Sequence, residues 1–316
     1  MSWRPGAPPA LLHRRARLLS DLRAFFARHG VLEVETPYLS GAGTTDPQVG
    51  SLSLDLPSGR RFLHTSPEFP MKRLLAAGVG DCYQVARVFR ADEAGRHHNP
   101  EFTLLEWYRV GFDHHRLMDE VEALVRAVDH EGRAAVTRRL TYAQALADHA
   151  GVDAHRDDAP ALARRARELG LAVQGELDRD AWLDLLLSTV VCPAFPPNRL
   201  TLIHDYPASQ AALARVRPGD PPVAERFELY WGALELANGF HELGDAAEQR
   251  RRFEAERAAR AQRGLADVPM DTRLLQALEA GLPDCAGVAL GVDRLLMALS
   301  GEDDIRRVLA FDTTRA

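Results

Sequence analysis

The sequence of 316 residues predicts an α+β fold in which an antiparallel sheet is flanked by helices. Two observations predict it. Strand-like runs come in neighbouring pairs joined by short turns, which is the pattern of antiparallel strands. Stretches with helical spacing of apolar residues stand before, between and after these pairs. The chain is 46% hydrophobic and 27% charged, so it can bury a sizeable core.

The N-terminal part predicts a helix followed by a short strand. Leucine and phenylalanine recur at helical spacing over residues 10–29, and Gly30 supplies a stop. The run VLEVETPYL, residues 31–39, predicts a strand that Pro37 ends. The first helix therefore presents an apolar face, and the chain then turns into a sheet.

Next come a strand pair and a second helix. Residues 50–64 alternate like two strands with a turn at Pro57-Ser58-Gly59. Ser66 is a plausible N-cap and Pro67 suits the first helical position, so we expect a helix to open there. The remaining elements are expected in this order: strands at 83–89 and 102–110, a mostly helical insertion or cap at about 115–190, a hairpin at 226–240 turning near Gly232, a charged helix with a solvated face at 246–264, and a glycine-spaced strand running into a helix at 287–301.

Charge and cysteine content exclude several classes of protein. The net charge is −6 and the pI about 6.1, so no overall basic field exists to hold long nucleic acid. The three cysteines are far apart and include no CxxC pair, which argues against a disulfide framework and fits a reducing cytoplasm. No apolar run is long enough to span a membrane, and the N-terminus lacks the features of a secretory signal.

The stretch FRADEAGRHHNPEF, residues 89–102, is a polar loop between two strand-like runs. It carries two arginines, three acids and His-His-Asn, a set that suits an anionic ligand with a planar base. Arginine makes bidentate contacts to phosphate or carboxylate oxygens, and Phe102 can stack on a ring. A solvated, charged β-turn is the alternative.

The stretch ELYWGALELANGFHEL holds Glu228, Glu235 and Glu242 among apolar residues. If the hairpin turns near Gly232, Glu228 and Glu235 come close across the strands, and Mg²⁺ is the natural bridge between two carboxylates. Residues of the opposite parity, Asn238, Phe240 and Glu242, are expected to line a separate pocket. Glutamates on an exposed face are the commoner case, but the apolar neighbours argue against it.

Glycines and histidines give weaker signals. GVALGVDR, residues 287–294, places glycines where a backbone approaches a ligand, with Arg294 at a helix start, and it matches neither a dinucleotide fingerprint nor a P-loop. The histidines have no helical i, i+4 spacing, so we expect solvent exposure or a ligand hydrogen bond rather than metal. They are His97, His98, His114 and His115.

Taken in order, these runs resemble the three signature motifs of class II aminoacyl-tRNA synthetases. The first helix with VLEVETPYL resembles motif 1, FRADEAGRHHNPEF resembles motif 2 and GVALGVDRLLM resembles motif 3. The resemblance covers nearly the whole chain and implies the class II catalytic core and a homodimer formed through motif 1. It also implies that Arg90 and Arg294 are catalytic, gripping ATP phosphates, and that Phe102 and Arg294 sandwich adenine.

TSPE, HNPEFTLLEWY and ELANGFHEL are similar to the lysyl branch of the class. That resemblance implies an acidic pocket, because a desolvated substrate ammonium must be paired. In that pocket Glu68 holds the substrate amino group and Glu242 faces the distal ammonium. The implied amino-acid-binding residues are Ser66, Pro67, Glu68, Glu106, Tyr108, Asn238, Phe240, Glu242 and Ala289. The implied ATP-binding residues are Arg90, Asp92, His98, Asn99, Phe102, Glu235, Leu236, Gly291 and Arg294, and Mg²⁺ is held by Glu228 and Glu235.

Motif 1 starts near residue 10, so no anticodon-binding domain is expected, and residues 1–316 are expected to form one catalytic domain with the insertion at 115–190. That pattern resembles the elongation factor P–(R)-β-lysine ligases, freestanding paralogues of lysyl-tRNA synthetase. Ala289 supports it, because tRNA-charging lysyl enzymes typically have glycine there. A methyl group at this place would reshape the pocket for a β-amino acid.

The resemblance implies two steps. ATP and Mg²⁺ activate (R)-β-lysine or lysine as an adenylate, and a lysine amine of elongation factor P then takes the aminoacyl group. No stable tRNA binding is expected. A minimal lysyl-tRNA synthetase, a synthetase-like asparagine synthetase and a regulatory paralogue are the alternatives. Acids in the pocket argue against aspartate as substrate, and the presence of Arg90 and Arg294 argues against a regulatory paralogue.

Overall fold

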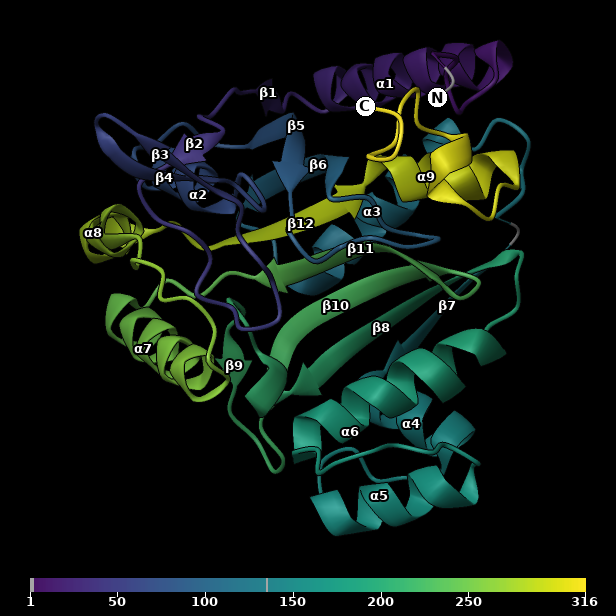
Figure 1. Cartoon of the computed structure of the whole chain (residues 1–316), viewed down its shortest axis with the longest axis vertical. Coiled ribbons are helices and arrows are strands. Elements are labelled where there is room, and N and C mark those ends of the chain that lie inside the picture. Colours follow the sequence, from purple (N-terminus) through teal and green to yellow (C-terminus); the bar gives the residue numbers. More distant parts are fainter. Residues whose placement is uncertain (1–2, 135) are drawn as a thin grey trace. The chain divides into compact units, whose positions relative to one another are not determined.

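The computed structural model describes residues 3–134 and 136–316, which divide into two compact units (Figure 1). The first unit combines the N-terminal segment up to Asp113 with Glu242–Ala316, and the second unit is His114–His241. Each unit has a hydrophobic core of its own. A single catalytic domain over the whole chain stays a prediction. Among the described residues, no helix has the length and apolar character needed to cross a bilayer.

The first unit contains a four-strand stretch of sheet in the order β1-β5-β6-β12 and a smaller sheet in the order β2-β4-β3. Strand β1 runs parallel to β5, whereas β5, β6 and β12 are antiparallel neighbours. Its elements are α1 Pro9–Arg28, β1 Leu32–Glu33, β2 Leu39–Ser40, β3 Ser53–Leu56, β4 Gly59–Leu63, α2 Glu68–Ala76, β5 Cys82–Phe89, β6 Glu101–Val110, α7 Ala246–Gln262, α8 Thr272–Gly281, β12 Cys285–Gly291, α9 Val292–Ser300 and the 3-10 turn Ile305–Arg307.

Helix α1 matches the predicted helix. Its apolar stripe is buried, and the Phe26 ring stacks on Tyr83 of β5 with centroids 4.3 Å apart. Gly30 follows with φ +66°, a left-handed conformation that glycine adopts without strain. The short strand that Pro37 was expected to end is even shorter than predicted, because β1 covers only Leu32–Glu33. A second two-residue strand, β2, follows Pro37.

Helix α2 begins one residue later than predicted. Pro67, not Ser66, is the N-cap residue, but the Ser66 hydroxyl oxygen still accepts a hydrogen bond from the Glu68 N–H at 3.0 Å. Helix α7 is confirmed as a charged helix. It is not solvated all round, since Phe253 is buried against Phe69 with ring centroids 5.7 Å apart. Helix α8 was not predicted.

The second unit orders its strands β11-β10-β8-β7, and β9 pairs with β10 (Figure 1). Its elements are α3 His114–Val128, β7 Val136–Thr141, α4 Tyr142–Ala150, α5 Ala159–Glu168, α6 Arg179–Leu186, the π-turn Leu187–Val191, the 3-10 turns Cys192–Ala194 and Ala208–Gln210, β8 Arg199–Pro207, β9 Val216–Arg217, β10 Val223–Trp231 and β11 Leu234–His241.

The segment at 115–190 is mostly helical, as predicted, but it also supplies strand β7, which runs parallel to β8. Neither β7 nor β8 was predicted as a strand. His114, at the start of α3, is only 1% exposed. Solvent exposure of His114 is therefore wrong, because the first turn of α3 is covered by the strands of its own unit.

The hairpin β10–β11 turns at Gly232, φ +54°, as predicted. The register slips next to Leu236: Leu229 pairs with Ala237, whereas Tyr230 pairs with Glu235. This β-bulge reverses the alternation of side chains along β11. The expected opposite parity of Asn238 and Phe240 is therefore wrong, because Asn238 lies directly across from Glu228, and Phe240 lies across from Arg226 on the same face.

Candidate active site

Three glutamates, a lysine and a tyrosine come together in the first unit, and we call this group the acid cluster. Its members are Glu68 and Lys72 on α2, Glu106 and Tyr108 on β6, and Glu242, whose N–H donates to the carbonyl of Cys285 on β12 at 2.9 Å. All except Glu68 are at most 2% exposed. Charged groups are buried at such a density only when they are paired with one another or with a ligand.

Lys72 is the centre of the acid cluster. Its Nζ lies 2.7 Å from Glu68 Oε1, one helical turn away, and 2.5 Å from Glu242 Oε2. Burial alone would lower the pKa of the Lys72 ammonium, but the charges of Glu242 and Glu68 outweigh burial and raise its pKa above the ordinary value. The two carboxylates thus already bind one ammonium group, so the residues of this cluster are suited to binding ammonium groups.

Glu106 is held by two hydroxyl groups. The Ser66 hydroxyl donates to Oε2 at 2.6 Å and the Tyr108 hydroxyl donates to Oε1 at 2.7 Å. Burial and the nearby charge of Glu68 raise the pKa of Glu106 to about 8, although both hydrogen bonds oppose the rise. Near neutral pH Glu106 therefore keeps a proton that it can release, and the Lys72 ammonium lies between the carboxylates of Glu68 and Glu242.

Gly287 keeps the acid cluster compact. It pairs with Tyr108 across the β6–β12 ladder. A Cβ atom at Gly287 would lie 2.2 Å from Tyr108 Cε1 and 2.5 Å from Glu242 Oε1, closer than any real contact. The glycine is thus required by packing against these two side chains rather than by an unusual backbone angle.

The structure brings together most of the predicted amino-acid-binding residues of the first unit. These are Ser66, Pro67, Glu68, Glu106, Tyr108 and Glu242. Sequence reasoning missed Lys72, and one signal for it was present. It is the chain's only lysine and stands four residues after Glu68 on a helix, the spacing at which an ion pair forms.

Ala289 lies next to the acid cluster along β12. It pairs with Glu106 across the ladder, and its methyl group packs against the small apolar group of Ala86, Val88 and Leu104. Phe102 packs against the same group. A change in the size of residue 289 therefore alters the packing of this apolar group, which Phe102 also contacts, at the position that pairs with Glu106.

The polar loop at 89–102 connects β5 to β6. The Arg90 guanidinium donates to Glu93 Oε1 at 2.9 Å and to the Thr65 carbonyl at 3.3 Å. Its charge also lies over the Phe102 ring, 5.1 Å from the centroid. A cation and an aromatic face stand side by side, which suits a ligand carrying phosphate and a planar base.

Arg294, in the first turn of α9, meets the same loop. It contacts His98 Nε2 at 2.5 Å and the His97 carbonyl at 3.3 Å. Asn99 is used differently, because its amide donates to the Glu101 carbonyl at 2.7 Å and its Oδ1 accepts from the Thr313 hydroxyl at 2.6 Å. Asn99 thus fixes the shape of the loop, and its contact with ATP stays a prediction.

The two remaining predicted ATP residues of the first unit lie at chain turns. Asp92 packs against Gly50, where a Cβ would lie 2.4 Å from Asp92 Oδ2. The Ala91 N–H donates to the Gly50 carbonyl at 2.9 Å. Gly291 is the N-cap residue of α9. The N-terminal N–H groups of such a helix favour an anion.

In the second unit, Glu228 is the buried acid of the hairpin. Arg226 donates to its Oε1 and Tyr230 to its Oε2, both at 2.5 Å. Glu235 pairs with Tyr230 and Asn238 with Glu228, so all of them share one face. The other two predicted residues of β11 are Phe240, whose ring lies 6.0 Å from the Arg226 guanidinium, and Leu236, which is buried. The hairpin therefore does gather Glu228 and Glu235 on one side.

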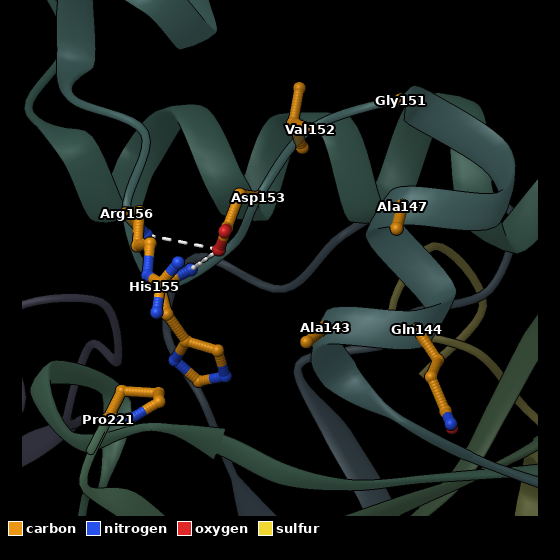
Figure 2. A pocket seen from close by; sticks show the side chains of 9 residues that line it. All are labelled: Ala143, Gln144, Ala147, Gly151, Val152, Asp153, His155, Arg156 and Pro221. Carbon is orange, nitrogen blue, oxygen red and sulfur yellow. Dashed lines mark hydrogen bonds between the residues drawn. The ribbon is translucent and has the colours of Figure 1, made fainter.

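An open depression of about 560 Å³ lies elsewhere in the second unit (Figure 2). Small side chains of α4 form one side, and His155 and Pro221 lie on the other. Asp153 accepts from the N–H groups of His155 and Arg156 at 2.9 and 3.1 Å, which shapes the loop. None of the predicted site residues lines this depression, so it is not the predicted site.

Comparison with known proteins decides the family. Residues 3–315 match the family described as tRNA synthetases class II (D, K and N). The chain belongs to this family of class II synthetases. The predicted fold class and the resemblance to the three class II motifs are thereby confirmed.

Curated relatives extend over the full length of this class II chain. A protein of Vibrio cholerae named elongation factor P–(R)-β-lysine ligase is 49% identical, covering 99% of this chain and 98% of its own. Proteins of the same name from Klebsiella pneumoniae and Yersinia enterocolitica are 48% and 47% identical, each covering 100% of this chain and 98% of its own. The predicted resemblance to these ligases is confirmed.

Proposed function

We propose that this class II chain uses ATP to activate (R)-β-lysine, or lysine, and transfers it to a lysine side chain of elongation factor P. The acid cluster is the observation that carries the proposal. Its three glutamates outnumber the single ammonium of Lys72. A dicationic amino acid supplies the charges that this surplus requires. The relatives' names support the same substrate and target.

In the first step, the carboxylate of the amino acid attacks the α-phosphorus of ATP, the bond to the β-phosphate breaks and pyrophosphate leaves. Arg90 beside Phe102, and Arg294 beside His98, are proposed to hold the phosphates and the adenine. These side chains act by positioning and by stabilising charge in the transition state, and no protein nucleophile is needed.

Mg²⁺ would neutralise phosphate charge when bound. We propose Glu228 and Glu235 as its protein ligands. Glu228 already accepts from Arg226 and Tyr230, but each carboxylate oxygen has a second lone pair, so the set fits one metal contact.

Elongation factor P supplies the second nucleophile, a lysine amine. That amine attacks the acyl carbon, forms an amide and releases AMP.

The test is the intact mass of elongation factor P after incubation with the full chain, ATP, Mg²⁺ and (R)-β-lysine. Parallel reactions replace the amino acid by α-lysine or aspartate, and the protein substrate by bulk tRNA. We expect the factor to gain one lysyl unit, faster with β-lysine, and tRNA to stay unmodified. Arg294→Ala is the matched variant and should abolish the gain.

Other outcomes assign other functions. Acylated tRNA with an unmodified factor would identify a minimal synthetase. Adenylation with aspartate alone would identify an asparagine-synthetase-like enzyme, which the acid cluster argues against.

A homodimer formed through α1, and a location in the cytoplasm, remain proposals. The dimer can be tested by light scattering of the full chain at several concentrations.

A further inference from the structure

A second group of ionisable side chains lies within the second unit, and none of its members belongs to the proposed activity. His114 and His115 stand in the first turn of α3, and His204 and Asp205 near the end of β8. One ligand atom from each of the four lies within 4.8 Å of the others. We call them the histidine cluster. Two segments about ninety positions apart in the sequence thus present three imidazoles and a carboxylate to one place.

The spacing of these atoms fits a tetrahedral metal ion. His114 Nε2 lies 3.4 Å from Asp205 Oδ1, and His204 Nδ1 lies 3.2 Å from Asp205 Oδ2. Zinc ligands stand at about 2.0–2.1 Å from the ion, so two ligand atoms of one tetrahedron are about 3.3 Å apart. His204 Nδ1 and Asp205 Oδ2 are therefore spaced as two ligands of one tetrahedron. The contact of His114, made to the other oxygen, is longer than a strong charge-assisted hydrogen bond.

His114 supplies an independent argument. It is 1% exposed, and neither of its ring nitrogens has a hydrogen-bond partner among the described residues. A buried polar atom without a partner costs roughly 1–3 kcal/mol, so such atoms are rare unless they meet water or an ion. His114 Nε2 faces the Asp205 carboxylate. The only contact of this imidazole with a counter-charge in the described part of the chain is thus the long one to Asp205, and a cation bound between them would satisfy both groups.

Arg217 fixes the carboxylate. It donates to Asp205 Oδ1 at 2.9 Å and to Glu225 Oε1 at 3.2 Å, and Glu225 is in turn bonded to His241 at 2.6 Å. Metal-binding carboxylates are commonly held in this way by an outer partner. The arrangement leaves Asp205 Oδ2, on the side of His204, as the oxygen available to an ion.

We propose that the histidine cluster binds a divalent transition metal ion of the zinc class. The ligands are His114, His204 and Asp205, with His115 as the fourth. Imidazole nitrogens select zinc over magnesium, which prefers oxygen ligands. The ion would tie the start of α3 to the end of β8. Spacing along the sequence argued against metal at His114 and His115, but the partners come from a distant strand.

The test uses the full chain, freed of metal with a chelator and without ATP or Mg²⁺. Zn²⁺ binding is measured by calorimetry, and Co²⁺ is added separately as a visible-light reporter of tetrahedral coordination. We expect one ion per chain and intense cobalt absorption. His204→Ala and, independently, His114→Asn should each weaken Zn²⁺ binding at least about tenfold. His130→Ala, at an exposed histidine at the end of α3, is the control and should bind as the wild type does.

Two results would overturn the proposal. One is wild-type chain that binds no stoichiometric Zn²⁺. The other is binding that either folded variant leaves unchanged, which would place the ion elsewhere. Circular dichroism establishes that each variant is folded. If one variant does not fold, the other decides the question.

Discussion

The acid cluster of the first unit and the Arg226–Glu228–Tyr230 group of the second unit both bury glutamate, but their charges balance differently. Glu228 has its own guanidinium at 2.5 Å and its own hydroxyl donor. In the acid cluster, two carboxylates share the one ammonium of Lys72 and a third keeps its proton. A balanced group stabilises a fold as it stands, whereas a surplus of one sign requires an incoming ligand. The acid cluster therefore needs a further cation to balance its charge, whereas Glu228 is already balanced and can offer an ion only a remaining lone pair.

The largest effect is expected from Lys72→Met. This change removes the only ammonium of the acid cluster and leaves the buried Glu242 and the partly buried Glu68 without a cation. Loss of one partner of a buried ion pair costs about 3–5 kcal/mol. Urea unfolding at neutral pH should show that loss in the free energy of unfolding. Arg73→Met, on the exposed face of the same helix, should change it by less than about 0.5 kcal/mol. A similar small change for both variants would contradict the role given to Lys72.

Glu228→Gln tests the balanced group. The amide can still accept from Tyr230, but it leaves the largely buried Arg226 without its counter-charge. We expect a loss of about 2–3 kcal/mol in the free energy of unfolding, because one partner of a buried ion pair has lost its charge. Glu176→Gln, at an exposed position of this unit, is the matched control. Unchanged stability in Glu228→Gln would mean that Arg226 finds another partner.

Glu106→Gln should increase the free energy of unfolding relative to the wild type rather than decrease it, and only as the pH rises. Folding raises the pKa of Glu106 from 4.5 to about 8. Between these values the folded chain holds a proton that the unfolded chain has released, so the stability of the wild type falls as the pH increases. Glutamine does not titrate. The variant should therefore gain on the order of 2 kcal/mol over the wild type between about pH 6 and pH 8. Parallel stability curves for the two proteins would show that Glu106 is ionised throughout.

Much of the acid cluster was predictable because its residues lie on regular elements. Glu106 and Tyr108 alternate along a strand, and Ser66 and Glu68 stand at a helix start, so local rules place them. Lys72 was missed because its role depends on Glu242, which is 170 positions away and is brought near only by β12. A contact between two residues far apart in the chain leaves no signal in the sequence around either of them.

The hairpin of the second unit shows a different limit. Its turn at Gly232 follows from the sequence, but the bulge at Leu236 does not. One extra residue in a strand reverses the face of everything beyond it, so a parity argument fails at that point. The strands β7 and β8 were missed for a related reason. Strand β8 is placed by pairing with β10, and β7 by pairing with β8, and neither pairing leaves a signal in the local sequence.

The smallest and most specific effect is expected from Ala289→Gly. Ala289 faces Glu106 across the ladder and packs in the group that also supports Phe102, so removal of its methyl group alters the space beside the acid cluster without removing a charge. A β-amino acid carries its amino group one carbon further from the carboxylate than an α-amino acid does. If the methyl group adapts the pocket to that shift, the variant should lose preference for (R)-β-lysine over α-lysine by about tenfold, or about 1.4 kcal/mol. The ratio of kcat/KM for the two amino acids, measured by pyrophosphate release, tests this. Ala86→Gly, a neighbour on β5 in the same group, is the control. A ratio unchanged in Ala289→Gly, or changed equally in both variants, would assign Ala289 to packing alone and leave the choice between the two lysines to the carboxylates of the acid cluster.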